Sequence, residues 1–338
     1  MTAVAGGQAL GPFVIERLLA RGGMGEVYLA RDTRTGHAVV LKLPLVELLG
    51  DVAARTRFDR EAAALRRLDH PGVQRWIESG WLGQRPYIAL QYVDGESLRQ
   101  VLQRHGRLAP QEALGIGIQI AGALAYCHAQ GVVHRDLKPD NVVITPAGRP
   151  VLIDFGSALM GGARRITFSG FSGELGTPEY MAPEQVQGKR GDQRTDVYAL
   201  GTLLYETLAG RPPFAAQSGE GAIHIMRRHL EESPPPLQAS GLDHLQQGAL
   251  ARALRRDPEA RYPTMEAFRR ALEDPASAAA AGEVEPGWPF APTRTAAWGV
   301  SVDEPQSLRD WLRYLFVALA TLLVLAAIGI AAAWLRPS

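Results

Sequence analysis

The sequence predicts an α+β protein with two lobes, the first rich in strands and the second helical, followed by one apolar helix near the C-terminus. Up to about residue 91 the chain reads as strands with one helix, and the strands are β-rich runs separated by glycines. Apolar residues at helical spacing dominate after Gly95. From Tyr314 to Leu335 no residue carries a charge. This order predicts a strand-rich N-lobe over about 11–91 and a helical C-lobe over about 94–273.

Three strands are expected early in the first lobe. Phe13 to Leu19 and Val27 to Ala30 are β-rich runs separated by glycines, and AVVLKL at residues 38–43 is a third. The residues from Asp32 to Gly36 favour a turn between the second strand and the third.

Helices are expected at three places. Apolar residues recur at helical spacing between Arg55 and Leu68, namely Phe58, Ala62, Leu65 and Leu68. Pro110 suits the first turn of a second helix, which Gly131 can end. The residues from Asp196 to Ala209 form a third apolar helix.

Composition narrows the class of protein. The chain has 338 residues, with 36 Lys and Arg against 35 Asp and Glu, so it lacks the clustered basic excess that is usual in proteins that bind nucleic acids, and no such partner is expected. A single cysteine, Cys127, excludes an intramolecular disulfide. Its neighbours, ALAY and HAQG, indicate a small buried core residue rather than a reactive thiol.

A glycine-rich run, LARGGMGEVYLA, spans Leu19 to Ala30. Glycines let backbone N–H groups approach phosphate oxygens, because no Cβ stands in the way. Alone, the run is equally compatible with a simple turn. It joins two strands, which argues against a dinucleotide-binding fold, and it lacks the Lys-Ser/Thr ending of a Walker loop.

Further polar residues interrupt apolar strands. Lys42 lies in an otherwise apolar strand, where a lysine is costly unless paired, and Glu61 on the predicted helix is a candidate partner; an edge lysine facing solvent is the alternative. HRDLKPDN at 134–141 and DFG at 154–156 each follow short β-like runs. The oxygens of Asp136, Asn141 and Asp154 suit magnesium and a hydroxyl nucleophile, although an isolated loop Asp is more often a turn former.

These segments together resemble those of the eukaryotic-like (Hanks-type) protein kinases, and the resemblance runs from about Phe13 to Leu272. The wording of GGMGEVYLA and GTPEYMAPEQ is most similar to that of bacterial serine/threonine kinases. The resemblance implies a bilobal protein-kinase fold over 11–273 and transfer of the γ-phosphoryl group of ATP to protein serine or threonine. It implies ATP and Mg²⁺ as cofactors, with Mn²⁺ as an alternative ion, and protein substrates. It also allows a homodimer for phosphorylation in trans.

The resemblance assigns roles to individual positions. Asp136 would orient the substrate hydroxyl and accept its proton, and Lys138 would stabilise the transferring phosphoryl group. Lys42 would bind the α- and β-phosphates, held by Glu61. Asn141 and Asp154 would hold the metal. The implied nucleotide site comprises Leu19, Ala20, Gly22, Gly23, Gly25, Val27, Val40, Lys42, Leu90, Gln91, Val93 and Val143.

Other positions gain structural roles by the same resemblance. Glu184 would pair with Arg261, and Asp196 would brace the catalytic loop. Thr177 would be structural, with its hydroxyl reaching Asp136 or Lys138. Lys138 together with Thr177 follows the serine/threonine pattern rather than the tyrosine pattern.

Two departures from the family pattern affect the nucleotide site. Ala20 replaces the first glycine of the loop, and Val40 stands where alanine is usual above the adenine ring. Overpacking of this kind typically costs about 1–3 kcal/mol. Neither removes a catalytic group. The competing function is a membrane-tethered pseudokinase scaffold, which would be indicated by loss of Lys42, Asp136 or Asp154, and all three are present.

Regulation by phosphorylation is expected between Asp154 and Glu184. Thr167, Ser169 and Ser172 lie there in a glycine-rich stretch. Arg135 is expected to lack a partner until a phosphate, which adds about −1.5 to −2 charge, pairs with it.

The C-terminal region is expected to anchor the protein. Residues 274–308 are rich in Ala and Pro and predict a flexible linker; the alternative is a tail packed on the domain through Trp288, Phe290 and Trp298. The 22 uncharged residues of 314–335 are long enough for a single helix through a lipid bilayer. No signal peptide precedes the domain, so the kinase is expected in the cytosol, with the C-terminus across the cytoplasmic membrane.

Overall fold

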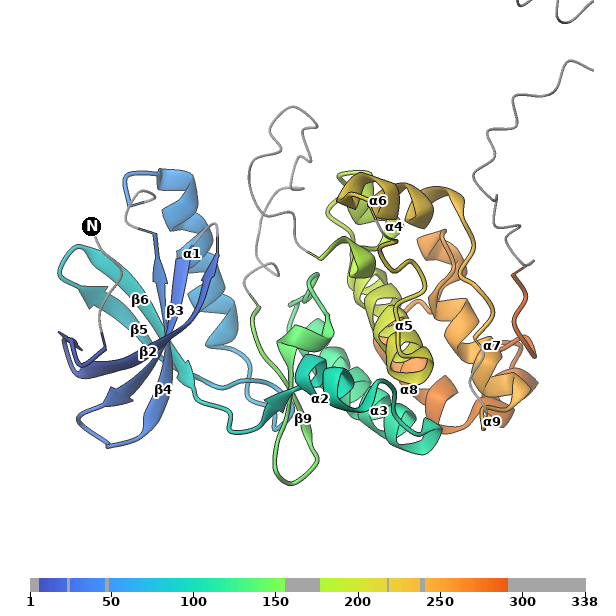
Figure 1. The fold of residues 1–338 in the computed structure, drawn as a ribbon, viewed down its shortest axis with the longest axis horizontal. Helices are drawn as coiled ribbons and strands as arrows, with labels where there is room; N and C mark the ends of the chain where they lie inside the picture. Colours follow the sequence, from blue (N-terminus) through green and yellow to red (C-terminus); the bar gives the residue numbers. More distant parts are fainter. Residues whose placement is uncertain are drawn as a thin grey trace, which may run out of the picture. The chain divides into compact units, whose positions relative to one another are not determined.

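The computed structural model describes residues 6–22, 25–45, 49–155, 177–217, 219–237 and 241–290. The chain divides into two units, Met1–Thr293 and Arg294–Ser338, and every described residue belongs to the first. Within it, a strand-rich lobe is followed along the chain by a helical lobe (Figure 1). This is the two-lobed arrangement that the sequence predicts.

The N-lobe is an antiparallel sheet with strand order β1-β2-β3-β4-β6-β5. The expected strands are present, and β5 and β6 complete the sheet. One helix, α1 (Val52–Leu65), lies between β4 and β5 in the sequence, and it ends three residues before the expected boundary at Leu68. The strands are β1 (Ala9–Leu10), β2 (Phe13–Gly22), β3 (Gly25–Asp32), β4 (Ala38–Pro44), β5 (Trp76–Leu82) and β6 (Arg85–Gln91).

The strand register gives the sheet two distinct faces. Val27 lies opposite Lys42, which lies opposite Ile88 in β6, so these side chains share the face toward the main core. The alternate residues, including Tyr28 and Leu41, form a separate small core on the outer face. The inner face therefore carries residues of the predicted nucleotide site, and the outer face has packing of its own.

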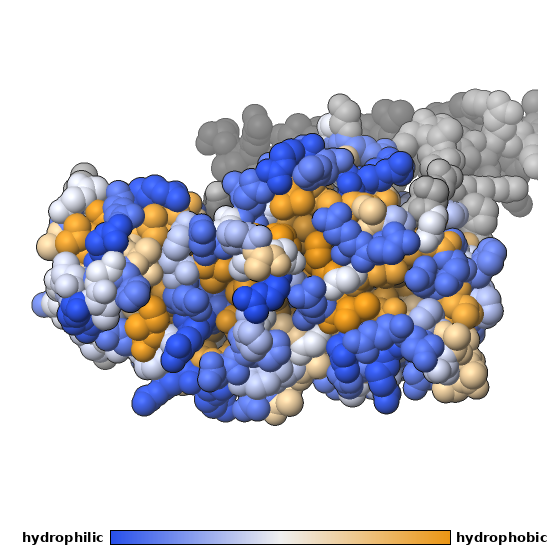
Figure 2. Space-filling model, turned by 90° about the horizontal axis from the view of Figure 1, so that it is seen from below, coloured by the Kyte–Doolittle hydropathy of each residue, from blue (hydrophilic) through white to orange (hydrophobic). Residues whose placement is uncertain are grey.

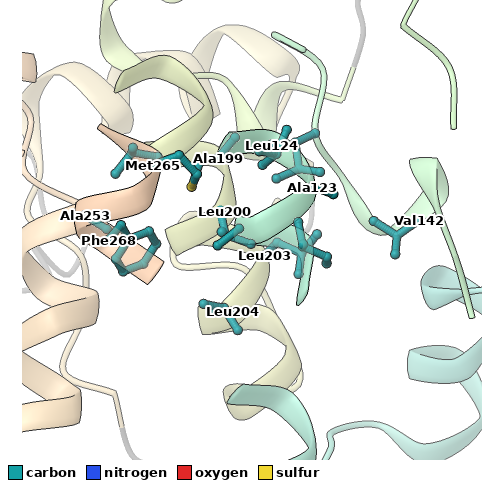
Figure 3. Close-up of a cluster of buried hydrophobic side chains, with 14 of the residues drawn as sticks. Ala123, Leu124, Val142, Ala199, Leu200, Leu203, Leu204, Ala253, Met265 and Phe268 are labelled. Atoms are coloured by element: carbon teal, nitrogen blue, oxygen red, sulfur yellow. The ribbon is translucent and has the colours of Figure 1, made fainter. Parts of the chain in front are cut away.

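The C-lobe is built around the buried helix α5, which packs against α3, α7 and α8. Its core is apolar, and Figure 3 shows Leu200, Leu203 and Leu204 of α5 among side chains of the neighbouring helices. The helices are α2 (Leu98–His105), α3 (Pro110–Ala129), α4 (Pro183–Val186), α5 (Gln193–Ala209), α6 (Ala222–Glu231), α7 (His244–Ala253) and α8 (Met265–Glu273).

The helix boundaries follow the capping signals in the sequence. Pro110 is the first residue of α3, and Gly131 follows its end, as expected. Asp192 caps the N-terminus of α5, and Gly210 ends it in the left-handed conformation. Cys127 of α3 is fully buried, and burial raises the pKa of its thiol to about 12, which agrees with a core role.

A small three-stranded sheet positions the catalytic loop. It pairs β7 (Glu96–Ser97), β8 (Val142–Ile144) and β9 (Pro150–Leu152). The loop from His134 runs between α3 and β8 and contains the short 3-10 helix η2 (Pro139–Asn141). A bridge between Val73 and Leu152 links this sheet to the chain leading into β5.

Residues 275–290 are not a flexible linker. Helix α9 (Pro275–Ala280) packs on α7 and α8, and Val284 is buried in the main core. The Trp288 indole donates to the carbonyl of Pro234 at 3.0 Å, and its ring lies 6.0 Å from that of Tyr205. The alternative, a tail packed on the domain through Trp288 and Phe290, therefore holds as far as residue 290. Trp298 and the rest of 291–308 lie outside the described residues.

The segment 275–290 can pack closely on α7 because Gly248 has no side chain and leaves a notch in the surface of that helix. A Cβ placed there would lie 1.8 Å from the carbonyl oxygen of Glu285, so only glycine admits the extension at this point. Arg252 of the same helix donates to the carbonyl of Glu283 at 2.5 Å. Shape complementarity and a charged hydrogen bond both hold the extension against α7.

Figure 2 views the molecule from below and shows hydrophilic side chains on most of the projecting surface, with hydrophobic ones mainly in the recesses between them. Within the described part of the chain, no helix is both long enough and apolar enough to span a bilayer. The segment 314–335 lies outside that part.

Candidate active site

Asp196 of α5 holds the backbone of the catalytic loop in place. Its carboxylate accepts hydrogen bonds from the backbone N–H groups of His134 and Arg135 at 2.8 and 2.7 Å, and it contacts the His128 ring at 2.7 Å. Burial raises the pKa of Asp196, but the hydrogen bonds and nearby histidine charges outweigh it and lower the pKa below its usual value. Asp196 thus braces the loop as an ionised group, as expected.

Asp136 lies where two other predicted residues converge. Lys138 Nζ lies 3.2 Å from its Oδ2, and the Asn141 amide donates to its backbone carbonyl at 2.7 Å and to Oδ2 at 3.3 Å. The Asn141 amide nitrogen is thus engaged with Asp136, and its carbonyl oxygen can serve as a ligand. Three predicted site residues from one loop meet at one carboxylate.

Asp154 joins this loop to the N-lobe. Its Oδ1 lies 2.6 Å from Nζ of Lys42, across a sequence separation of 112 residues. The next residue, Phe155, is buried against the ring of His134 at 4.6 Å between centroids. The described partner of Lys42 is therefore Asp154. The side chain of Glu61 lies outside the described residues, so its pairing with Lys42 stays a prediction.

The predicted nucleotide wall is apolar on the inner face of the sheet and on β8. Val40, Leu90 and Val143 are buried, and Val27 and Val93 are half-buried. Leu19, Ala20 and Gly22 on β2 are exposed, and Gly23 is outside the described residues. A Cβ at Gly25 would lie 2.5 Å from the carbonyl oxygen of Leu43, so this glycine brings the hairpin close to β4.

Gln74 takes part in the predicted hinge, although the sequence did not indicate it. Its buried side chain donates to the carbonyl of Gln91 at 2.9 Å, and the Gln91 N–H donates to the carbonyl of Arg75 at 2.8 Å. A carbonyl oxygen has two lone pairs, so that of Gln91 can accept a second hydrogen bond from an adenine.

Arg99 of α2 is a second residue that sequence reasoning missed. Its guanidinium contacts Asp140 of the catalytic loop at 3.2 Å, Glu206 of α5 at 2.7 Å and the Tyr180 hydroxyl at 2.7 Å. Tyr180 belongs to the 3-10 helix η3 (Pro178–Tyr180), and its hydroxyl also donates to Glu206. One arginine thereby ties four elements beside the catalytic loop. An isolated arginine on an amphipathic helix gives no sequence signal for this.

The expected ion pair between Glu184 and Arg261 is present and buried, with two N–O contacts of 2.9 and 2.8 Å. The neighbouring Gln185 donates to the carbonyl of Arg135 at 2.9 Å and so links α4 to the catalytic loop. Its role was not visible in the sequence.

Two expectations about the regulatory region fail. The Arg135 guanidinium is already bonded, because Nε and Nη2 donate to the carbonyls of Arg190 and Gly191 at 3.1 and 3.3 Å. In the described part of the chain, the Thr177 hydroxyl makes no hydrogen bond to Asp136 or Lys138. Gly156, Thr167, Ser169 and Ser172 lie outside the described residues.

Comparison with known proteins agrees with this geometry. Residues 13–272 match the family described as the protein kinase domain. The chain is 35% identical over 279 residues to a probable serine/threonine-protein kinase PknB from Bifidobacterium longum, covering 79% of this chain and 39% of that protein. It is 40% identical over 232 residues to the serine/threonine-protein kinase PknA of Mycobacterium tuberculosis, covering 67% of this chain and 53% of the relative.

Solved structures support the same fold. The crystal structure of the Mycobacterium tuberculosis PknI kinase domain, C20A mutant, aligns with a TM-score of 0.61 at 30% identity, covering 81% of this chain and all of that one. The chain spans about two fifths to one half of the length of the curated relatives described above. By family match, identity and site geometry, this chain belongs to the protein kinase family, among the serine/threonine kinases of bacteria.

Proposed function

We propose that this chain transfers the γ-phosphoryl group of Mg-ATP to serine or threonine residues of proteins. The observation that carries the proposal is the convergence of Lys138 and Asn141 on Asp136, with Asp154 and Lys42 paired at 2.6 Å beside them. This is the set of groups that phosphoryl transfer by positioning and charge neutralisation requires.

Each group has a defined task in this reaction. The Asp136 carboxylate accepts a hydrogen bond from the substrate hydroxyl, orients its oxygen and takes its proton. Lys138 lies within 3.4 Å of both carboxylate oxygens, so its charge sits beside the reacting oxygen. Lys42 projects from β4 toward Asp154, where it can hold phosphate oxygens. Mg-ATP, when bound, supplies the transferable phosphoryl group and a metal charge that offsets those oxygens.

The donor set fits a magnesium ion. Asp154 offers a carboxylate whose side chain is about half exposed. Asn141 offers a side-chain carbonyl oxygen, which is held in place by the two hydrogen bonds that its amide nitrogen donates to Asp136. Hard oxygen ligands of this kind, one or two from the protein and the rest from phosphates and water, are what Mg²⁺ prefers. Mn²⁺ accepts similar ligands.

The test is Asp136→Asn in the full chain. We expect ATP binding to be nearly unchanged and turnover to fall by on the order of 10²–10⁴-fold, because the proton acceptor is lost while the phosphate groups keep their ligands. Asp69→Asn, at an exposed carboxylate before β5, is the control and should keep wild-type turnover. Phosphate transfer from [γ-³²P]ATP to a serine-containing protein measures both.

The same reaction mixture tests a finer proposal, that the kinase phosphorylates itself. Mass spectrometry after incubation with Mg-ATP should find phosphate on Thr167, Ser169 or Ser172, since these hydroxyls lie between Asp154 and Glu184. Near-wild-type phosphate transfer by the Asp136→Asn variant would show that Asp136 is not the proton acceptor. No transfer by the wild type, with ATP still bound, would favour the pseudokinase scaffold instead.

We also propose that residues 314–335 anchor the kinase in the cytoplasmic membrane as a single helix. The support is the run of 22 residues without charge, bounded by Arg313 and Arg336. Trp311 and Trp334 stand near its two ends, where interfacial aromatics are expected.

A further inference from the structure

The outer face of the N-lobe sheet contains a buried charge with no part in the proposed chemistry. Glu26 directly follows Gly25 in β3 and is only 4% exposed. Side chains alternate along a strand, so Glu26 points away from the nucleotide side that Val27 faces. A buried carboxylate is costly unless it is paired and hydrogen-bonded.

Arg85 at the start of β6 supplies the pairing. Its Nη2 donates to Glu26 Oε2 at 2.9 Å, and its Nε donates to the backbone carbonyl of Pro44 at 2.9 Å. The Tyr28 hydroxyl donates to the same Oε2 at 2.9 Å, and Arg21 Nε lies 3.6 Å from Oε1. Burial raises the pKa of Glu26, but Arg85, Tyr28 and Arg21 outweigh it and lower the pKa, so the carboxylate stays charged at neutral pH.

These contacts join two strands that are essential to the site. Pro44 ends β4, two residues after Lys42. Glu26 is the second residue of β3 and lies next to the tip of the glycine-rich hairpin. Arg85 therefore clamps the hairpin to the strand that contains Lys42, from the side opposite to the nucleotide.

The hairpin needs such a clamp because its other strand has little packing. Residues 16–22 of β2 are exposed, and the β2–β3 register shifts twice, between Ile15 and Arg17 and between Leu18 and Ala20. Such irregularities weaken strand pairing locally. The position of the hairpin thus depends on β3, and at its tip β3 is held by Glu26 and by the close approach of Gly25 to Leu43.

We propose that Arg85 and Glu26 are positioning residues that fix the glycine-rich hairpin over the nucleotide, so that they set the affinity for ATP without touching it. This rests on the ATP-dependent activity proposed above. The pair acts on binding of the nucleotide and leaves the groups around Asp136 unchanged. Its loss should therefore raise KM for ATP and leave kcat and the KM for the protein substrate alone.

The experiment compares Arg85→Met and Glu26→Gln with the full wild-type chain. Glu26→Gln keeps the side-chain length, and Arg85→Met keeps an unbranched stem as far as the ε position without the guanidinium. Each should raise KM for ATP about tenfold, equivalent to about 1.4 kcal/mol, with kcat within about twofold. Titration of ATP by calorimetry should show the same change in Kd. Arg85→Lys, which keeps the charge, should restore at least part of the affinity.

Arg34→Met is the matched control. Arg34 lies on the same face and bonds Asp32 and Glu78 at 2.8 and 2.9 Å, at the opposite end of β3 from the hairpin tip. It should lower the melting temperature as Arg85→Met does and leave KM for ATP unchanged.

Several results would overturn the inference. Arg85→Met and Glu26→Gln with a wild-type KM for ATP would do so, as would an equal rise in KM in Arg34→Met. A fall in kcat at unchanged KM for ATP would show that the pair acts on the phosphoryl-transfer step rather than on ATP binding. Failure of the wild type itself to bind ATP would refute the proposed function instead, so the two failures are distinguishable.

Discussion

Arg135 and Asp154 hold their backbones at φ angles of 63° and 61°, and they are the non-glycine residues with positive φ in the described part of the chain. Conformations of this kind cost about 1–3 kcal/mol each and persist only when the surroundings enforce them. The Asp196 carboxylate and the Gln185 amide form hydrogen bonds with the backbone of Arg135. Phe155 follows Asp154 directly and is buried, so it holds the backbone of Asp154 in place. The strain therefore lies at one group of the proposed chemistry, Asp154, and at the residue that directly precedes another, Asp136.

Glu184 and Arg261 lead to a prediction about stability. Both are almost fully buried, and Glu184 also accepts a hydrogen bond from Thr195 at 2.8 Å. Removing one member of a buried pair leaves the other charge uncompensated, so Glu184→Gln should lower the free energy of unfolding by about 3–5 kcal/mol. Urea unfolding followed by circular dichroism measures this. Glu259→Gln, at an exposed partner of Arg194, is the control and should cost about 1 kcal/mol or less.

The pH dependence of that difference has a definite sign. Burial raises the pKa of Glu184, but Arg261 and Thr195 outweigh it, so the pKa in the folded state lies below the usual 4.5. The unfolded state then binds the proton first as pH falls. The stabilising difference between wild type and Glu184→Gln should be complete above about pH 5 and shrink as the pH falls below 4.5. A difference that grows toward acid would contradict the assignment.

Prediction from the residues alone succeeds where the partners lie close in the chain, whereas the long-range contacts of Glu184 with Arg261 and of Asp196 with the catalytic loop were expected only from the family resemblance. Asp136, Lys138 and Asn141 belong to one short loop, and their convergence follows from it. Arg135 was wrongly expected to be unpaired. Its acceptors are backbone carbonyls 55 and 56 residues later in the chain, and no sequence pattern indicates that a backbone carbonyl will accept such a bond. The Asp154 contact of Lys42 depends on how the two lobes meet, which periodicity cannot supply.

At the scale of elements, the three strands and three helices placed from the sequence were predictable because caps and periodicity are local. The other elements were not placed. The packed extension at 275–290 was not the favoured interpretation, since Ala and Pro composition alone suits a linker. What decides it is a glycine in α7 and an apolar site between helices, both of which exist only in the folded lobe.

A truncation series tests the extension. A chain ending at residue 293 should keep the stability of the kinase domain, whereas one ending at residue 273 loses the burial of Ala278, Val284 and Trp288. We expect a loss of about 3 kcal/mol or more, at about 1.5–3 kcal/mol for each large apolar side chain. Thermal unfolding measures the difference.

Substitution of single tryptophans supplies the control for this series. Trp288→Ala should destabilise by about 3 kcal/mol, the low end of the usual cost of truncating a core tryptophan, because Trp288 is only half-buried. Trp81→Ala, whose side chain is 49% exposed on β5, should change stability by about 0.5 kcal/mol. Equal stability of the chains ending at 273 and 293 would show that the extension contributes nothing.

At the scale of the whole molecule, the proposed anchor gives a prediction about fractionation. The full chain should sediment with membranes and resist extraction by salt and carbonate, because a spanning helix is held by hydrocarbon rather than by charge. Deleting residues 308–338 should release a soluble kinase with unchanged activity on a free peptide. Extraction of the full chain by carbonate alone would show that no helix spans the bilayer.

The packing of the extension at Gly248 also has a consequence for how the domain unfolds. Ala278 and Val284 lie in the same core as α5 and α8, so the extension cannot detach without exposing that core to water. The amide of Glu283 donates to the carbonyl of Ala278 and that of Ala281 to Ser277, so both are held within this segment. Segments that share a core tend to unfold as one cooperative unit. These amides should therefore exchange with deuterated solvent as slowly as those of α7, which makes the extension part of the last structure to melt.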